Sequence, residues 1–276
     1  SSCVGSSLKQ MPRSSGKSTH IKPHLVRPRS HKLRRYRRHR RDFQRWCRKR
    51  RVKQTHASVI VDRKLPYRAH YAGGKNPLSS SLRKFYAQRY TLFSKYDKGV
   101  QLDDEMWYSV TPEPVAREQA VHLVSHSTVA RPVILDGFSG AGGNAVQLAM
   151  QAAIGEVLAI DVNKPRLESA RHHATIYKCE NKLSCIQADF RSVPQLIRRG
   201  WLDGVLLCPP WADEGKVAKE DGAFTLRRLG AALDGFSLLR AALRMSQHIA
   251  MYLPPQISTS ELNHCAALAG SSLLLM

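Results

Sequence analysis

From residue 131 onward, short apolar runs alternate with longer stretches in which apolar residues recur at helical spacing. The runs are apolar throughout rather than alternating with polar residues, which is typical of strands buried on both faces of a parallel sheet. They predict strands at 132–136, 156–162, 183–189, 203–208 and 248–255, and the closing SSLLLM predicts the start of a sixth.

The stretches between these runs predict helices at 144–153, 163–179 and 193–200, within 223–247, and at 258–269. Asn163 suits the N-cap of the second helix, and Pro165 suits its first turn. Alternating strands and helices predict an α/β fold with a doubly wound, mostly parallel, Rossmann-like sheet. Ligands of such sheets bind beyond the carboxyl ends of the strands, where the loops converge.

Positive charge is concentrated in the first quarter of the chain. Residues 1–68 contain 22 lysine and arginine residues and two acidic residues, so they carry 20 of the net 23 positive charges. Their densest piece, residues 29–53, has Tyr36, Phe43 and Trp46 among its arginines. Arginine suits phosphates and aromatic rings stack on bases, while like charges at this density oppose folding. We expect a disordered basic arm for RNA phosphates, an import receptor, or both.

Three parts are therefore expected: the arm at 1–68, a small helical lead-in at 69–125 and the sheet domain at 126–276. No apolar run approaches the ~18 residues of a membrane span and no secretory signal is present, so we expect a soluble protein without membrane contact. The six cysteines form no C-x-x-C pair. We expect no metal site and a reducing compartment.

A glycine-rich loop, DGFSGAGGN at 136–144, follows the first predicted strand, and Asp161 ends the second. Gly140, Gly142 and Gly143 allow a sharp turn and a close approach to a ligand. A carboxylate at Asp161 can accept hydrogen bonds from both ribose hydroxyls of an adenosine-type cofactor. The loop also satisfies the dinucleotide fingerprint, so it does not separate a dinucleotide from S-adenosylmethionine. A structural turn with an exposed aspartate is the simpler alternative.

The ends of the third and fourth strands favour S-adenosylmethionine. Asp189 can accept from an adenine amino group, and the Phe190 ring can flank the base. In the CPPW sequence that follows, the Cys208 and Pro209 carbonyls have no ladder partner and can accept from an –NH₂ group. Trp211 supplies a stacking face that would favour a cationic 7-methylguanine, although an ordinary packed indole is the alternative. These residues suit methylation of an exocyclic amine by direct displacement, with orientation rather than a general base driving catalysis.

At this point the chain resembles the trimethylguanosine synthase family, the RNA cap hypermethylases, over roughly residues 81–270. The resemblance begins with SLRKFYAQRYTLFSKYDKGVQLDDEMWYSVTPE at 81–113 and continues through DGFSGAGGN, AIDVNKPRLESARHHATIY, QADF and CPPW in the family's order. The SVTPE and PPW elements together are specific. The glycine loop alone is not.

The resemblance implies a methyltransferase that uses S-adenosylmethionine, without metal, to methylate N2 of a 7-methylguanosine cap twice. The product would be 2,2,7-trimethylguanosine on small nuclear or nucleolar RNAs, made by a monomer in the nucleus, including its nucleolus. The lead-in would help form the cap site. The implied cofactor residues are Asp136, Phe138, Gly140, Gly142, Asn144, Asp161, Asp189 and Phe190. The implied catalytic residues are Cys208, Pro209, Pro210 and Trp211, and the implied substrate contacts are Trp211, Ser109, Thr111 and His173.

Thr111, Pro112 and Glu113 also predict a helix start, whose free N–H groups favour an anion such as a triphosphate bridge. A purely structural cap is the alternative.

The chain departs from the family pattern in four places. Cys208 replaces a serine, 212–214 replaces Gly-Gly-Pro, and His172 and His173 replace an asparagine pair. The second family asparagine contacts guanine, so His173 would do so with added pH dependence, unless it is a surface histidine. The fourth departure is that the strand hairpin that usually closes this fold is not expected in the sequence as far as Met276. Either the given sequence is incomplete, or the edge of the sheet is completed in another way.

Three rival functions stay open from the sequence. One is a guanine-N2 or adenine-N6 methyltransferase of ribosomal or transfer RNA, which CPPW alone permits. Another is a dinucleotide-binding protein of the dehydrogenase type. The third is a non-catalytic RNA-binding protein with a decayed domain, which the altered 212–214 segment allows.

Overall fold

The computed structural model contains one six-stranded, all-parallel sheet with the strand order β10-β9-β4-β1-β2-β3. The strands are β1 (Val133–Asp136), β2 (Glu156–Asp161), β3 (Leu183–Gln187), β4 (Gly204–Leu207), β9 (Ile249–Met251) and β10 (Leu273–Leu275). The predicted doubly wound α/β fold is therefore confirmed, with all six expected strands in one sheet.

The structure describes residues 82–125, 127–195, 197, 200–213, 216–217, 219–220, 223–230, 233–270 and 273–275. The basic arm predicted at 1–68 lies outside the described residues. Within them, no helix is long and apolar enough to span a bilayer.

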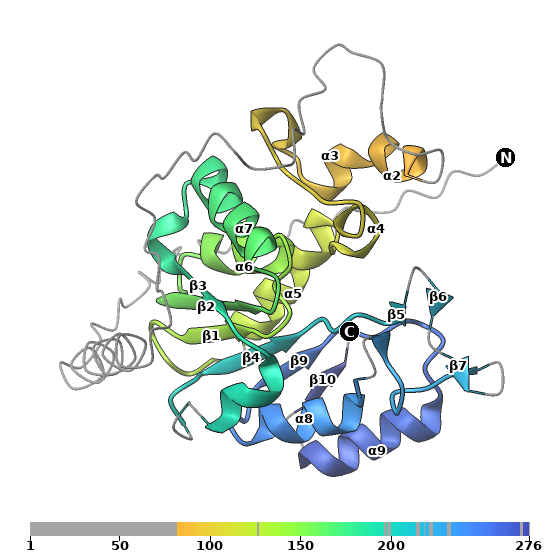
Figure 1. Ribbon diagram of the computed structural model, residues 1–276. Helices are drawn as coiled ribbons and strands as arrows, with labels where there is room; N and C mark the ends of the chain where they lie inside the picture. The colour runs from red at the N-terminus through yellow and green to blue at the C-terminus, as the bar shows by residue number, and fades with distance from the viewer. Residues whose placement is uncertain are drawn as a thin grey trace, which may run out of the picture.

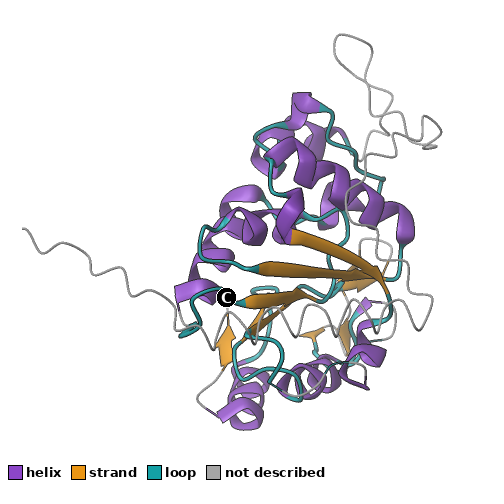
Figure 2. Ribbon diagram, turned by 90° about the vertical axis from the view of Figure 1, so that its left-hand side faces the viewer, coloured by secondary structure: helices purple, strands orange, loops and turns teal. Residues whose placement is uncertain are grey.

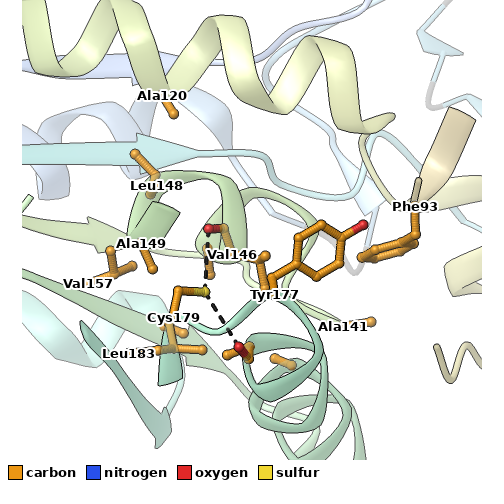
Figure 3. Packing of buried hydrophobic residues seen from close by; sticks show 14 of the residues in the cluster. Phe93, Ala120, Ala141, Val146, Leu148, Ala149, Val157, Tyr177, Cys179 and Leu183 are labelled. Carbon is orange, nitrogen blue, oxygen red and sulfur yellow. Dashed lines mark hydrogen bonds between the residues drawn. The ribbon is translucent and has the colours of Figure 1, made fainter. Parts of the chain in front are cut away.

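Helices cover both faces of the sheet (Figures 1 and 2). One face carries α5 (Glu113–Ser125), α6 (Gly143–Met150) and α7 (Lys164–Tyr177), and the other carries α8 (Gly235–Leu243) and α9 (Thr259–Ala269). Two buried hydrophobic clusters fill the space between sheet and helices. Figure 3 shows part of the first, where side chains of α6, α7, β2 and β3 meet.

Local capping explains where several helices begin. The Asn163 side chain accepts a hydrogen bond from the Arg166 N–H at 3.2 Å, as expected for the N-cap of α7. Asp234 accepts from the Phe236 N–H at 3.0 Å. This cap sets the start of α8, so the long helix predicted within 223–247 is shorter, because 223–224 belongs to a two-residue strand instead.

Two other segments differ from expectation. The helix predicted at 193–200 is the 3-10 helix η3 (Phe190–Gln195), with Pro194 inside it. Since proline lacks an N–H, it cannot join a regular α-helical ladder. Between Trp211 and α8 the chain forms two small antiparallel ribbons, β5 with β6 and β7 with β8. Their bounds are Ala212–Asp213, Lys216–Val217, Lys219–Glu220 and Ala223–Phe224.

The lead-in contains α2 (Arg83–Ala87), α3 (Arg89–Leu92), η1 (Tyr96–Lys98) and α4 (Met106–Ser109). Its buried Leu92, Phe93 and Trp107 belong to the same hydrophobic cluster as Ala145 and Leu148 of α6. Figure 3 shows Phe93 beside Tyr177, the last residue of α7. The described part of the lead-in therefore shares the core of the sheet domain.

Candidate functional site

The carboxyl ends of the parallel strands form one edge of the sheet, and backbone hydrogen bonds continue past the strand ends there. The Gly137 N–H donates to the Leu206 carbonyl at 2.9 Å, and the Tyr252 N–H donates to the Leu207 carbonyl at 2.8 Å. The glycine loop, the CPPW segment and the end of β9 are thus held side by side.

The glycine loop turns as its sequence predicts. Gly140 has φ of 50° and Gly142 has φ of 84°, a region that side chains rarely adopt. A Cβ atom on Gly140 would lie 2.8 Å from the Met106 sulfur, and one on Gly142 would lie 2.7 Å from the Ala170 Cβ. Gly142 is therefore needed for the close approach of α7 as well as for the turn, whereas at Gly140 the flexible Met106 side chain could move and the positive φ is the stronger requirement.

Asp161 holds this loop directly. One carboxylate oxygen accepts from the Gly140 N–H at 2.7 Å, and the other accepts from the Asn163 N–H at 2.8 Å. Each oxygen of an ionised carboxylate has a further acceptor position. Asp161 can therefore hold the loop and still accept from two ribose hydroxyls.

Asp136, at the end of β1, is fully buried, and neither carboxylate oxygen has a hydrogen bond of normal geometry within the described residues. Burial raises its pKa to about 7, although the nearby Phe138 N–H acts in the opposite direction. The nearby Ser139 hydroxyl and Ala145 N–H also lower the pKa of this carboxyl. A buried carboxylate with no hydrogen bond of normal geometry, beside the glycine loop, fits a cationic, hydrogen-bond-donating ligand such as S-adenosylmethionine.

Asp189 and Phe190 are both occupied by protein contacts. The Asp189 carboxylate forms an ion pair with Arg191 at 2.6 Å, and this hydrogen bonding lowers the pKa of Asp189. Phe190 is 2% exposed, because its ring packs under Gly137. Phe138, 5.4 Å from it between ring centroids, is only partly buried. Of the two rings, Phe138 has more surface to offer a base.

The Asn144 side chain is buried and donates its amide to the Gln119 side chain of α5. It therefore joins the start of α6 to a neighbouring helix rather than pointing at open space.

In the CPPW segment, the Pro210 carbonyl accepts from the Gly230 N–H at 3.0 Å. The carbonyl oxygens of Cys208 and Pro209 receive no hydrogen bond from the part of the chain that is described. Burial raises the pKa of the Cys208 thiol well above its usual range, and the nearby Asp136 carboxylate adds to that shift. Cys208 therefore stays a thiol, and its backbone, rather than its sulfur, offers the acceptor.

Trp211 is half-buried, and its indole N–H donates to the Tyr252 carbonyl at 3.1 Å. The two rings lie 4.9 Å apart between centroids. The sequence analysis did not single out Tyr252, although this residue directly follows β9 at the carboxyl edge of the sheet. Its position beside Trp211 and Cys208 makes it part of the candidate site.

The lead-in brings Thr111 to this site, while Ser109 is turned back on its own helix. Thr111 is buried, and its side chain influences the pKa of the Cys208 thiol. The Ser109 hydroxyl is exposed and donates to the Glu105 carbonyl at 2.8 Å.

His173 differs from both expectations made for it. It is neither a surface residue nor free to contact guanine, because it is fully buried and both ring nitrogens bond to backbone groups. Burial lowers its pKa to about 4. The near-neutral pH dependence expected from this residue is accordingly corrected.

The first residue of α5, Glu113, already places a negative charge at the start of this helix. The Glu113 carboxylate accepts from the Ser94 N–H at 2.7 Å and from the Tyr177 hydroxyl at 2.5 Å. These bonds tie the lead-in to α7, which corresponds to the structural alternative for this helix start. An anion there would have to approach the Glu113 carboxylate.

Comparison with known proteins gives a consistent result. A model of the RNA cap guanine-N2 methyltransferase family matches residues 131–272. The chain is 32% identical to the trimethylguanosine synthase of Schizosaccharomyces pombe over 192 residues, which are 67% of this chain and 76% of that protein. It is 27% identical to the trimethylguanosine synthase of Saccharomyces cerevisiae over 199 residues, 71% of this chain and 62% of that protein.

Among solved structures, a Pyrococcus horikoshii protein described as an RNA methyltransferase aligns over 64% of this chain and 78% of its own. Its TM-score is 0.42 at 16% identity. The fold assignment therefore stands on the strand order above.

Proposed function

Because the chain belongs to the RNA cap guanine-N2 methyltransferase family, we propose that the carboxyl edge of its sheet holds S-adenosylmethionine beside a 7-methylguanosine cap. Members of this family methylate the guanine N2 of the cap and form trimethylguanosine. The observation that carries the residue assignment is the convergence of three acceptors at this edge that have no hydrogen bond of normal geometry from the described residues: the Asp136 carboxylate and the Cys208 and Pro209 carbonyls.

On the donor side, Asp161 would hold the ribose and Asp136 the cationic part of the cofactor. Asp189 would accept from the adenine amino group after releasing part of its pairing with Arg191. S-adenosylmethionine supplies an electrophilic methyl group on a sulfonium sulfur. Asp136 is well suited to such a cation, because it is fully buried and its oxygens have no hydrogen bond of normal geometry in the described structure.

On the acceptor side, Trp211 would stack on the methylated guanine, whose positive charge strengthens contact with an indole face. The bond from the indole N–H to the Tyr252 carbonyl holds the ring in place. The Cys208 and Pro209 carbonyls would accept from the guanine amino group. Two consecutive prolines, Pro209 and Pro210, restrict the backbone that carries these acceptors.

The proposed chemistry is a direct displacement. The N2 lone pair forms the new N–C bond as the S–C bond breaks, and the bonding electrons stay on sulfur as a neutral thioether. The N2 proton then leaves to water or to one of the acceptor carbonyls. The protein's part is orientation and exclusion of water.

The strand order alone would not have decided this function, because it is also the order of the dinucleotide-binding fold. Family membership argues against the dehydrogenase alternative and against a ribosomal or transfer RNA substrate. The buried Asp136 carboxylate, together with Trp211 at the same edge, argues against a decayed, non-catalytic domain.

Incubation of the protein with 7-methyl-GTP and S-adenosylmethionine, followed by mass analysis, tests the proposal. We expect products heavier by one and by two methyl groups, with GTP left unmodified. Methylation of GTP at the same rate, or of neither nucleotide, would overturn the assignment of the acceptor.

We also propose that the full protein works on capped RNA in the nucleus. The support is compositional: the arginine-rich segment at 29–53 suits both RNA phosphates and an import receptor. Residues 1–68 fused to a fluorescent reporter should accumulate in nuclei, and a diffuse reporter would remove the import role.

A further inference from the structure

Two adjacent histidines on α7 reach from that helix to the lead-in. The His172 Nε2 lies 2.9 Å from the Gly99 carbonyl oxygen. The His173 Nε2 accepts from the Gln101 N–H at 2.8 Å, and its Nδ1 lies 2.8 Å from the Ala141 carbonyl oxygen. Of these two histidines, only His173 therefore bonds to both the lead-in and the glycine loop.

These contacts define the state of the His173 ring. Because Nε2 accepts a hydrogen bond, it carries no proton, and Nδ1 must be protonated to donate to the Ala141 carbonyl. An imidazolium would face the Gln101 N–H with a second N–H and lose that bond. The ring is fully buried, with the Phe93 ring 5.0 Å away and the His172 ring 6.1 Å away between centroids.

The two segments joined by His173 belong to opposite halves of the candidate site. Ala141 lies between Gly140, which Asp161 holds, and Gly142 at the start of α6. Gln101 opens the stretch that leads through α4 to Thr111, next to Cys208. The His173 imidazole thus links the glycine loop, where the methyl donor would bind, to the 101–111 segment, beside which the cap would lie.

We propose that His173 is a positioning residue that holds the glycine loop and the 101–111 segment in register, so that the donor methyl group and guanine N2 meet in line. This inference rests on the proposed function. In-line displacement is sensitive to placement, since a shift of about 1 Å can cost about 100-fold in rate. His173 acts through the two backbone segments and touches neither substrate.

A merely structural histidine would stabilise the fold without affecting the turnover of folded protein. The two roles separate in kcat measured well below the unfolding temperature. The informative variants are H173L, which keeps much of the volume and removes both hydrogen bonds, and H173Q, whose amide carries one donor and one acceptor. H172L is the matched control, because His172 contacts the lead-in but not the glycine loop.

For H173L we expect kcat on 7-methyl-GTP to fall about 10- to 100-fold, with smaller changes in the KM values for nucleotide and donor. H173Q should recover most of this loss, and H172L should change stability more than kcat. If H173L does not fold, H173M provides the same comparison, because its unbranched side chain adapts to irregular buried space and makes neither hydrogen bond.

Wild-type kcat in folded H173L or H173M would overturn this inference alone. An unmodified protein that leaves 7-methyl-GTP unchanged would overturn the proposed function, and the inference with it.

Discussion

At the residue scale, Asp136 is the clearest conflict between stability and function. A fully buried carboxylate with no hydrogen bond of normal geometry destabilises the folded state when it is ionised. Its folded pKa of about 7 lies above the ordinary value of 3.8. Ionisation therefore costs folding free energy increasingly as the pH rises from about 4 to 7. A cationic donor would relieve that cost.

Replacing this carboxylate should stabilise the free protein and impair donor binding. We expect D136N to unfold several degrees higher than the wild type at pH 8, with a smaller difference at pH 5, because only the ionised carboxylate is unfavourable. Thermal unfolding at the two pH values and titration with S-adenosylmethionine measure both effects. A D136N protein that is less stable at pH 8 would show that the carboxylate has stabilising partners.

His173 makes the opposite contribution to pH dependence. Its folded pKa of about 4 lies below the ordinary 6.5, so the folded protein binds fewer protons between these values. The contribution of the neutral His173 ring to the free energy of unfolding is complete above pH 6.5. It is lost as the pH falls from 6.5 toward 4. The shift corresponds to about 3 kcal/mol at most.

H173Q removes this titration, so its stability should fall less steeply than that of the wild type between pH 6.5 and 4. Urea unfolding at pH 7 and pH 4.5 measures the difference. Parallel loss in both proteins would mean that other groups cause the acid sensitivity.

Trp211 should matter for the acceptor and little for the donor. We expect W211A to lose methylation of 7-methyl-GTP almost completely while S-adenosylhomocysteine still binds with nearly wild-type affinity. W211F keeps a ring but loses the bond to the Tyr252 carbonyl, and it should retain intermediate activity. Equal loss of donor binding and methylation in W211A would contradict the assigned stacking role.

At the element scale, the lead-in is fastened to the start of α7 by charge as well as by packing. Arg166 pairs with Asp103 at 2.6 Å and with Glu105 at 2.5 Å, and these partners raise the pKa of its guanidinium. Its side chain is 17% exposed. Such a partly buried network is worth more than a surface ion pair, because water screens it less.

R166M should therefore cost about 1–3 kcal/mol of folding free energy, since it leaves two carboxylates without their partner. Lys164 and Glu168 form an exposed pair at 3.5 Å on the same helix and provide the control. K164M should change stability by no more than about 0.5 kcal/mol. Urea unfolding of both variants decides this, and equal small effects would mean that packing and the hydrogen bonds to Glu113, His172 and His173 hold the lead-in without help from the ion pairs.

At the scale of the whole molecule, most of the net positive charge and the candidate site lie in different parts of the sequence. The first 68 residues carry most of the net charge, while the candidate site lies on the sheet edge and the lead-in. Phosphate contacts release counterions, so they supply affinity that falls with salt but little sequence selectivity.

Removal of residues 1–68 should weaken binding of capped RNA and flatten its salt dependence, while methylation of free 7-methyl-GTP continues. Binding titrations at several salt concentrations and the nucleotide assay together test this. Complete loss of activity on the free nucleotide would mean that the arm helps to build the site.

The sequence by itself determined the order of the six sheet strands and of the main helices between them, the sharp glycine loop and the cap at Asn163. These features depend on local patterns: continuous apolar runs, a positive φ that glycine tolerates, and a side chain within reach of its own helix. The set of strand ends that carry the site followed from the same patterns, because parallel strands place their carboxyl ends at one edge.

Only the tertiary structure decided how individual side chains are used. Sequence distance does not show that His173 meets Gln101 and Ala141, that Gly137 leaves room for the Phe190 ring, or that Tyr252 holds the Trp211 indole. Each of these contacts joins residues from different elements. Packing between elements sets burial and hydrogen-bond partners, and these in turn decide which polar groups stay free for a ligand.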